Sequence, residues 1–152
     1  MVTIRPVRRE DVRPLIALTV APEDATFVAP NAVTLAEAPY ETGAHVFAIW
    51  ADDRLVGLAA LVDNRDYSYL EPDDDPNSAF LWRLMVGSDH QRQGIGHAAM
   101  HQVFDWARAR ALPRLFTSVV AGNTAASRFY ESLGFALTGR DIDGEAEMLR
   151  HL

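Results

Sequence analysis

Alternating apolar and polar positions divide most of the chain into short strands. Residues 2–7 alternate with the period of two expected of a strand. The apolar runs at 45–50 and 55–62 flank an aspartate-rich turn, which predicts an antiparallel hairpin. The run at 79–86 predicts a central strand. Two further patterns, a strand at 114–120 and a final hairpin at 135–152 that turns at Asp143-Gly144, complete the predicted sheet.

Two helices are predicted in the first third of the chain. Residues 9–20 place Val12, Leu15, Ile16 and Leu18 on one helical side, and Pro14 is tolerated only if that helix begins just before it. Residues 31–43 predict a short helix that is capped by Thr34 and ends near Pro39 and Gly43.

Two more helices follow the central strand. Residues 96–112 predict an amphipathic helix, because Ala99, Val103 and Trp106 follow Ile95 at helical spacing. Residues 123–134 predict a helix that stops at Gly134. The resulting order is strand, helix, helix, three strands, helix, strand, helix and two strands. This order predicts an α/β (α+β) fold with a mixed sheet and helices on its faces. With 152 residues, 49% of them hydrophobic, we expect a single domain over residues 1–152.

Composition narrows the classes of function. The net charge of −7 opposes binding to nucleic acid or to an anionic membrane, and no run approaches the roughly 20 apolar residues of a membrane span. The chain has no cysteine, which excludes disulfides, thiolate metal sites and a cysteine nucleophile. We therefore expect a cytoplasmic protein.

Residues 90–100 join the central strand to a helix through two glycines. Such a turn leaves backbone N–H groups free at the positive end of the helix dipole, a favourable place for phosphate. Gly94 and Gly96 would let the backbone approach phosphate closely, and Gln91 and Arg92 add donors. Neither the nucleotide-binding pattern G-x-x-x-x-G-K-[ST] nor G-x-G-x-x-G is present.

The same loop resembles the acyl-coenzyme A loop of the GNAT N-acetyltransferases, whose pattern is [QR]-x-x-G-x-[GA]. Gln91, Gly94 and Gly96 occupy the pattern positions, and residues 123–135 are similar to the family's later Asn, Ala, Tyr and Gly-Phe signature. The resemblance extends to the flanking strands and covers nearly the whole chain. It implies a mixed six- to seven-stranded sheet, a splayed fourth and fifth strand, and acetyl-CoA as cofactor.

The resemblance also implies roles for individual residues. Val86 would present its N–H to the thioester oxygen, and Tyr130 would protonate the leaving sulfur as a catalytic acid. Asn123 would contact the cofactor, although its residue type also suits a helix N-cap. The expected cofactor contacts are Leu84, Met85, Val86, Gln91, Arg92, Gln93, Gly94, Ile95, Gly96, Asn123 and Tyr130.

The general base departs from the family pattern. Relatives often carry a glutamate in the fourth strand, where this chain has Trp82 and Arg83. An alkyl amine with a pKa near 10.4 is only about one part in a thousand neutral at physiological pH, so a deprotonation route matters. The catalytic candidate is Glu71, with the aspartates at 73–75 as alternatives acting through water.

The acceptor is suggested by residues 66–77, which combine Tyr67 and Tyr69 with several carboxylates. This composition suits a small polycationic amine, and the chain layout is most similar to spermine/spermidine acetyltransferase-like members. A solvated turn-rich loop explains the same residues equally well. Aminoglycoside, peptide and protein acceptors, a non-catalytic acyl-CoA-binding module and a homodimer remain open.

Two other groups of residues have simpler explanations. His97 and His101 have the spacing of a zinc pair, but position 98 is alanine, so we expect no metal site. Arg108, Arg110 and Arg114 lie near a helix end, where cations suit the dipole; a functional role would be contact with the cofactor's adenosine phosphate.

Overall fold

The computed structural model describes residues 1–152 and contains a seven-stranded sheet with four helices. The strands are β1 (Val2–Pro6), β2 (Ala44–Ala51), β3 (Arg54–Asp63), β4 (Ala79–Val86), β5 (Arg114–Val120), β6 (Ala136–Ile142) and β7 (Glu145–His151). The helices are α1 (Val12–Ala17), α2 (Asn31–Glu37), α3 (Ile95–Ala109) and α4 (Thr124–Ser132). The predicted fold class and the predicted order of elements are confirmed.

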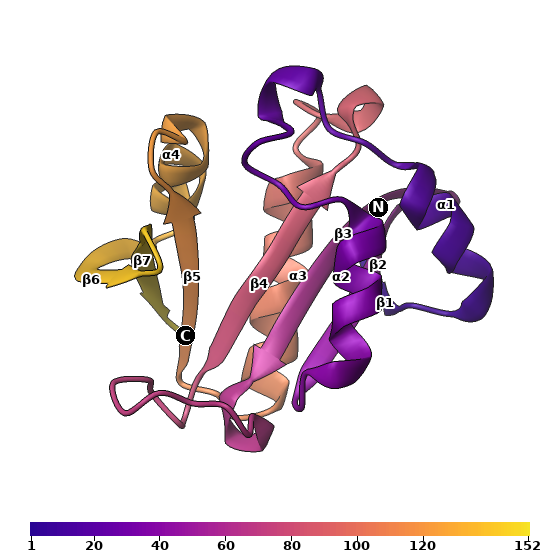
Figure 1. The fold of residues 1–152 in the computed structure, drawn as a ribbon. Coiled ribbons are helices and arrows are strands. Elements are labelled where there is room, and N and C mark those ends of the chain that lie inside the picture. Colours follow the sequence, from indigo (N-terminus) through magenta and orange to yellow (C-terminus); the bar gives the residue numbers. More distant parts are fainter.

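The sheet order is β1-β2-β3-β4-β5-β7-β6, and every neighbouring pair is antiparallel except β4 and β5. This parallel pair is short, because only Ala79–Leu81 on β4 lies opposite Leu115–Thr117 on β5. Beyond these residues the two strands diverge, as Figure 1 shows between the labels β4 and β5. The splayed strand pair that the resemblance implied is therefore present.

Helices cover both faces of the sheet. Leu15 of α1 and Leu35 of α2 pack with Leu58 and Met85 on one face, while α3 packs on the other. In Figure 1, α2 lies in front of β2 and β3, and α3 runs behind β4. None of these helices has the length and apolar character needed to cross a membrane.

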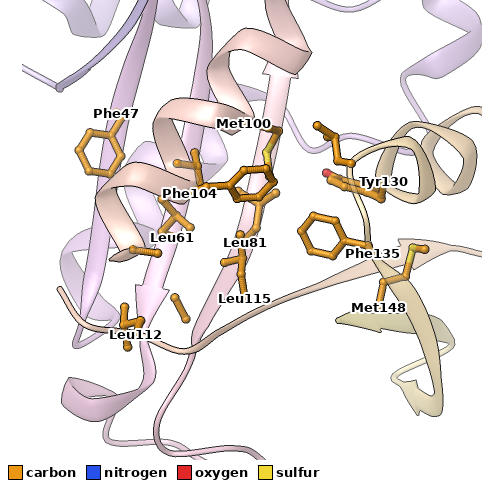
Figure 2. Packing of buried hydrophobic residues seen from close by; sticks show 14 of the residues in the cluster. Phe47, Leu61, Leu81, Met100, Phe104, Leu112, Leu115, Tyr130, Phe135 and Met148 are labelled. Atoms are coloured by element: carbon orange, nitrogen blue, oxygen red, sulfur yellow. The ribbon is translucent and has the colours of Figure 1, made fainter. Parts of the chain in front are cut away.

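The main core joins the two halves of the divided sheet. Phe104 of α3 lies 6.2 Å from Phe135, measured between ring centroids, and Tyr130 lies 5.3 Å from Phe135. Figure 2 shows Leu81 and Phe104 facing Tyr130 and Phe135 across this core. Buried side chains from both halves of the sheet pack in this one core. The two halves therefore stay in contact although β4 and β5 diverge.

Local turn and cap signals were only partly right. The Asp143-Gly144 turn is confirmed, with φ of 52° and 87° at the two residues. The predicted cap at Thr34 is wrong, because α2 begins at Asn31 after Pro30 and Thr34 is buried inside the helix. In α1, Leu15 is buried but Ile16 is 46% exposed, so the apolar side of that helix is narrower than predicted.

Candidate active site

A cleft of about 940 Å³ opens where β4 and β5 separate. Its walls come from both strands, from α4 and from residues 25–30, and the loop before α3 forms one side. The lining includes the predicted site residues Leu84, Val86, Gln91, Arg92, Gly94, Ile95, Gly96, Asn123 and Tyr130. The fold thus brings nine of the residues selected from the sequence around one cavity.

The loop before α3 is held in a shape that exposes the start of the helix. The Gln91 side chain donates to the Val86 carbonyl at 3.1 Å, which ties the loop to the end of β4. Gly94 has a φ of 76°, and the first intrahelical bond of α3 runs from the Ala98 N–H to the Gly94 carbonyl. The N–H groups before Ala98 therefore have no carbonyl partner within the helix, and they lie at the positive end of its dipole.

Gly96 is constrained by packing as well as by the loop. A Cβ at this position would come within 3.3 Å of the Phe129 ring on α4. The absence of a side chain lets α3 approach α4 closely at the rim of the cleft. The Phe129 ring in turn contacts His97, whose Nε2 lies 2.9 Å from the Ser132 hydroxyl.

The backbone of β4 alternates between its neighbour β3 and the cleft. The Gly87 N–H donates to the Val56 carbonyl on β3 at 2.9 Å. Since successive N–H groups along a strand point to opposite sides, Val86 and Leu84 direct theirs away from β3, toward the gap that β5 has left. The cleft therefore offers unpaired strand backbone to an extended ligand.

Tyr130 lines the cleft and is only 9% exposed. Burial raises the pKa of its phenol to about 12, and a hydrogen bond with Thr117 offsets part of that rise. The phenol therefore keeps its proton throughout the physiological range. Asn123 accepts a hydrogen bond from the Ala126 N–H at 3.2 Å, so it is the N-cap of α4 while also lining the cleft.

A second cavity of about 370 Å³ shares Phe80, Trp82 and Ile142 with the cleft and so lies next to it. It is strongly acidic: seven carboxylates and one guanidinium, that of Arg140, line it. The carboxylates belong to Glu37, Glu41, Asp73, Asp74, Asp75, Asp143 and Glu147. Residues far apart in the sequence, from α2 to β7, create this field.

Three of the predicted site residues do not line the cleft. Met85 is buried on the opposite face, where the Asn31 amide contacts its sulfur at 3.4 Å, because side chains alternate along β4. Gln93 and Glu71 are exposed, and neither lines either cavity. The Glu71 N–H is bonded to the Asp74 carboxylate in a local turn, so the proposed base is not brought to the cleft.

Thr117 and Glu145 are among the lining residues that sequence reasoning missed. Thr117 faces Tyr130, and Glu145 is the one carboxylate in the lining. Glu145 gave no local signal, since it follows the hairpin turn at Asp143-Gly144 and reads as an exposed strand position. Only the insertion of β7 between β5 and β6 brings it beside the cleft.

The sequence of the chain matches the model of the acetyltransferase (GNAT) family over residues 12–135. The chain belongs to this family. The matched region includes the loop before α3, the cleft walls on β4 and β5, and Tyr130 on α4. On β4, the positions where the resemblance implied a glutamate are occupied by Trp82 and Arg83, and both line the cleft.

Several characterised GNAT proteins are similar to this chain. The [ribosomal protein bS18]-alanine N-acetyltransferase of Escherichia coli K12 is 41% identical over 59 residues, which is 39% of this chain and 40% of that protein. The chain therefore spans about two fifths of that relative's length. The enzyme of the same name from Salmonella typhimurium is 30% identical over 103 residues, or 62% of this chain and 69% of the relative.

Among solved structures, the aminoglycoside acetyltransferase AAC(6')-Ib in complex with coenzyme A and kanamycin has a TM-score of 0.81. The alignment covers 99% of this chain and 95% of that one at 16% identity. This likeness shows that the two chains share the GNAT fold.

Proposed function

We propose that the protein is an acetyl-CoA-dependent N-acetyltransferase that transfers acetyl to a primary amine by direct attack in a ternary complex. The observation that carries the proposal is the cleft between β4 and β5, which combines the exposed start of α3, unpaired β4 backbone and Tyr130. Coenzyme A is bound by AAC(6')-Ib, which shares this fold. The cofactor phosphates would lie against residues 91–96, and the pantetheine arm would pair with Leu84 and Val86.

Two chemical requirements of acetyl transfer, a donor to the oxyanion and an acid for the leaving thiolate, have a candidate group in this cleft. The Val86 N–H points into the gap and would stabilise the oxyanion of the tetrahedral intermediate. Tyr130 would donate its hydrogen bond and then its proton to the departing thiolate. Because burial raises its pKa to about 12, the phenol is always protonated but is a weaker acid than an exposed tyrosine.

The acceptor that the adjoining cavity favours is a small polycationic amine, such as a polyamine. Arg140 is bonded to Asp74 at 2.8 Å and contacts Glu147 at 3.4 Å, and Asp75 pairs with Arg114. The remaining carboxylates, those of Glu37, Glu41, Asp73 and Asp143, have no basic partner and would attract ammonium groups. Burial and the nearby Glu41 raise the pKa of Tyr67 in this cavity, which reflects the same negative field.

A protein N-terminus or an aminoglycoside is the second candidate acceptor. The Escherichia coli relative acts on an alanine of a ribosomal protein, and AAC(6')-Ib was solved with kanamycin, an aminoglycoside.

The proposal also includes a cytoplasmic location, in keeping with a chain that lacks cysteine. The homodimer expected from the resemblance stays a prediction.

The test is turnover of purified protein with acetyl-CoA and a panel of spermine, spermidine, diamines, aminoglycosides and alanine-terminated peptides. Free thiol release gives the rate, and mass spectrometry identifies the acetylated product. Turnover with a polyamine supports the full proposal, whereas selective turnover of a peptide or an aminoglycoside supports the second acceptor. Binding of acetyl-CoA without turnover of any amine would leave a non-catalytic binding module.

Matched variants test the acidic cavity. The pair Glu37→Gln and Asp73→Asn removes two carboxylates that have no basic partner, and the pair Asp53→Asn and Glu131→Gln removes the same charge from exposed sites outside both cavities. We expect the first pair to raise the KM for spermine about three- to tenfold, and the second to leave it unchanged. An equal KM in both pairs would exclude the cavity as the acceptor site.

A further inference from the structure

The cleft contains one carboxylate, that of Glu145, and the reaction needs a base. An ammonium group must lose a proton before its nitrogen can attack the thioester, and the β4 positions facing this part of the cleft are Trp82 and Arg83. Neither can accept a proton at neutral pH. The base therefore has to come from another element of the cleft.

Glu145 is the first residue of β7, and its position follows from the order of the strands. It lies opposite Val120 of β5 and Ile142 of β6. Its Oε1 is 3.5 Å from the Ser118 hydroxyl, which is oriented to donate to it. Ser118 is the first β5 residue beyond the last position paired with β4, so the carboxylate reaches back toward the point where the strands separate.

The same position is next to the route from the acidic cavity. Glu145 and Glu147 are two residues apart on β7 and so share one face of the sheet. Glu147 lines the acidic cavity and Glu145 lines the cleft, while Ile142, opposite Glu145, lines both. An amine that passes from the acidic cavity to the cleft would therefore meet Glu145 at the junction.

Among the other titratable groups near the junction, Asp143 lines the acidic cavity and not the cleft, and the rest are occupied or lie elsewhere. Glu147 is buried and accepts a hydrogen bond from Thr138 at 2.8 Å, in addition to its contact with Arg140. His90 and His97 also line the cleft, but they belong to the loop and first turn of α3. That end of the cleft is the proposed phosphate side, and neither histidine lines the acidic cavity.

We propose that Glu145 is the general base of the acetyl transfer, held by Ser118; this inference rests on the proposed function. The Glu145 carboxylate takes one proton from the acceptor ammonium, and the freed nitrogen lone pair forms the C–N bond to the thioester carbonyl carbon. The tetrahedral intermediate collapses with cleavage of the C–S bond, and the thiolate takes the proton of Tyr130. The second proton on nitrogen returns to the Tyr130 oxygen through water, and Glu145 releases its proton to solvent.

The experiment compares wild type, Glu145→Gln and the control Glu131→Gln, which changes an exposed glutamate on α4 outside both cavities. The readouts are kcat/KM for the best amine of the panel from pH 6 to 10, and acetyl-CoA affinity by calorimetry. Loss of a general base costs about 10²-fold. We expect that loss for Glu145→Gln at pH 7, a smaller deficit as the pH rises and more amine is already neutral, and unchanged acetyl-CoA affinity.

Several results would overturn the assignment. Wild-type kcat/KM in Glu145→Gln, or a deficit that is the same at every pH, means that Glu145 is not the base. If the glutamine variant does not fold, Glu145→Asp replaces it, with about a tenfold loss expected from a carboxylate drawn back by one methylene. A wild-type protein that turns over no amine contradicts the proposed function itself, whereas a fully active glutamine variant contradicts the base alone.

Discussion

The Thr117 hydroxyl donates a hydrogen bond to the Leu81 carbonyl at 3.0 Å, at the last position where β4 and β5 are paired. Both residues are buried. The same side chain lines the cleft beside Tyr130, and its hydroxyl offsets part of the rise in the pKa of that phenol. One side chain therefore closes the strand ladder where the cleft begins and also positions the group proposed as the acid.

Replacing Thr117 with valine should weaken both the fold and the reaction. Valine keeps the shape of the side chain but leaves the buried Leu81 carbonyl without this partner, at a cost of about 1–3 kcal/mol in the free energy of unfolding. Urea denaturation measures that loss, and kcat should fall because Tyr130 is less well held. Thr117→Ser retains the hydroxyl and should stay close to wild type. An unchanged urea midpoint for the valine variant would show that the bond contributes nothing.

The role of the loop before α3 can be tested by comparing alanine substitutions at two glycines that have the same left-handed backbone, Gly94 in the loop and Gly144 in a distant turn. Gly94 and Gly144 have φ of 76° and 87°, and in both cases a Cβ would meet no atom within 4 Å. Alanine at either site therefore costs about 1 kcal/mol of stability through the left-handed backbone alone. We expect only Gly94→Ala to weaken acetyl-CoA binding, about tenfold, because relief of the strain shifts the N–H groups before α3. Calorimetric titration of both variants checks this, and equal affinities would remove the loop from the binding site.

The predicted site residues that the fold places beside the cleft were those whose signals are local. The glycines before α3 and Tyr130 in its motif could be recognised because chain neighbours determine their environment. Thr34 was misassigned because its residue type suits a cap but says nothing about Pro30, after which α2 in fact begins. Glu145 could not be selected at all, because its role depends on β7 lying between β5 and β6, and no neighbouring residue encodes that pairing.

Arg110, at the end of α3, was considered as a contact of the cofactor, but in the structure it pairs with a buried aspartate that is distant in sequence. Arg110 bonds the carboxylate of Asp63 at 2.9 Å, and Arg65 bonds it at 2.8 Å. Asp63 is fully buried at the end of β3, and these partners hold its pKa at about 2. The start of α3, at Ile95, is about 20 Å away along the helix, so this cluster lies too far from the glycine loop to hold the same phosphates.

Asp63→Asn should therefore destabilise the fold without changing the affinity for acetyl-CoA. Removing one partner of a buried ion pair costs about 3 kcal/mol. Because the folded pKa is depressed below the unfolded value of 3.8, the wild-type carboxylate contributes its stability above about pH 4 and loses it as the pH falls toward 2. The difference between wild type and Asp63→Asn in urea midpoint should accordingly be full at pH 6 and shrink between pH 4 and 2.

The control is Asp66→Asn, which removes only an exposed carboxylate 3.7 Å from Arg110 and should change stability by less than about 1 kcal/mol. A difference that persists unchanged at pH 2 would mean that packing, and not the charge of Asp63, stabilises this end of the sheet.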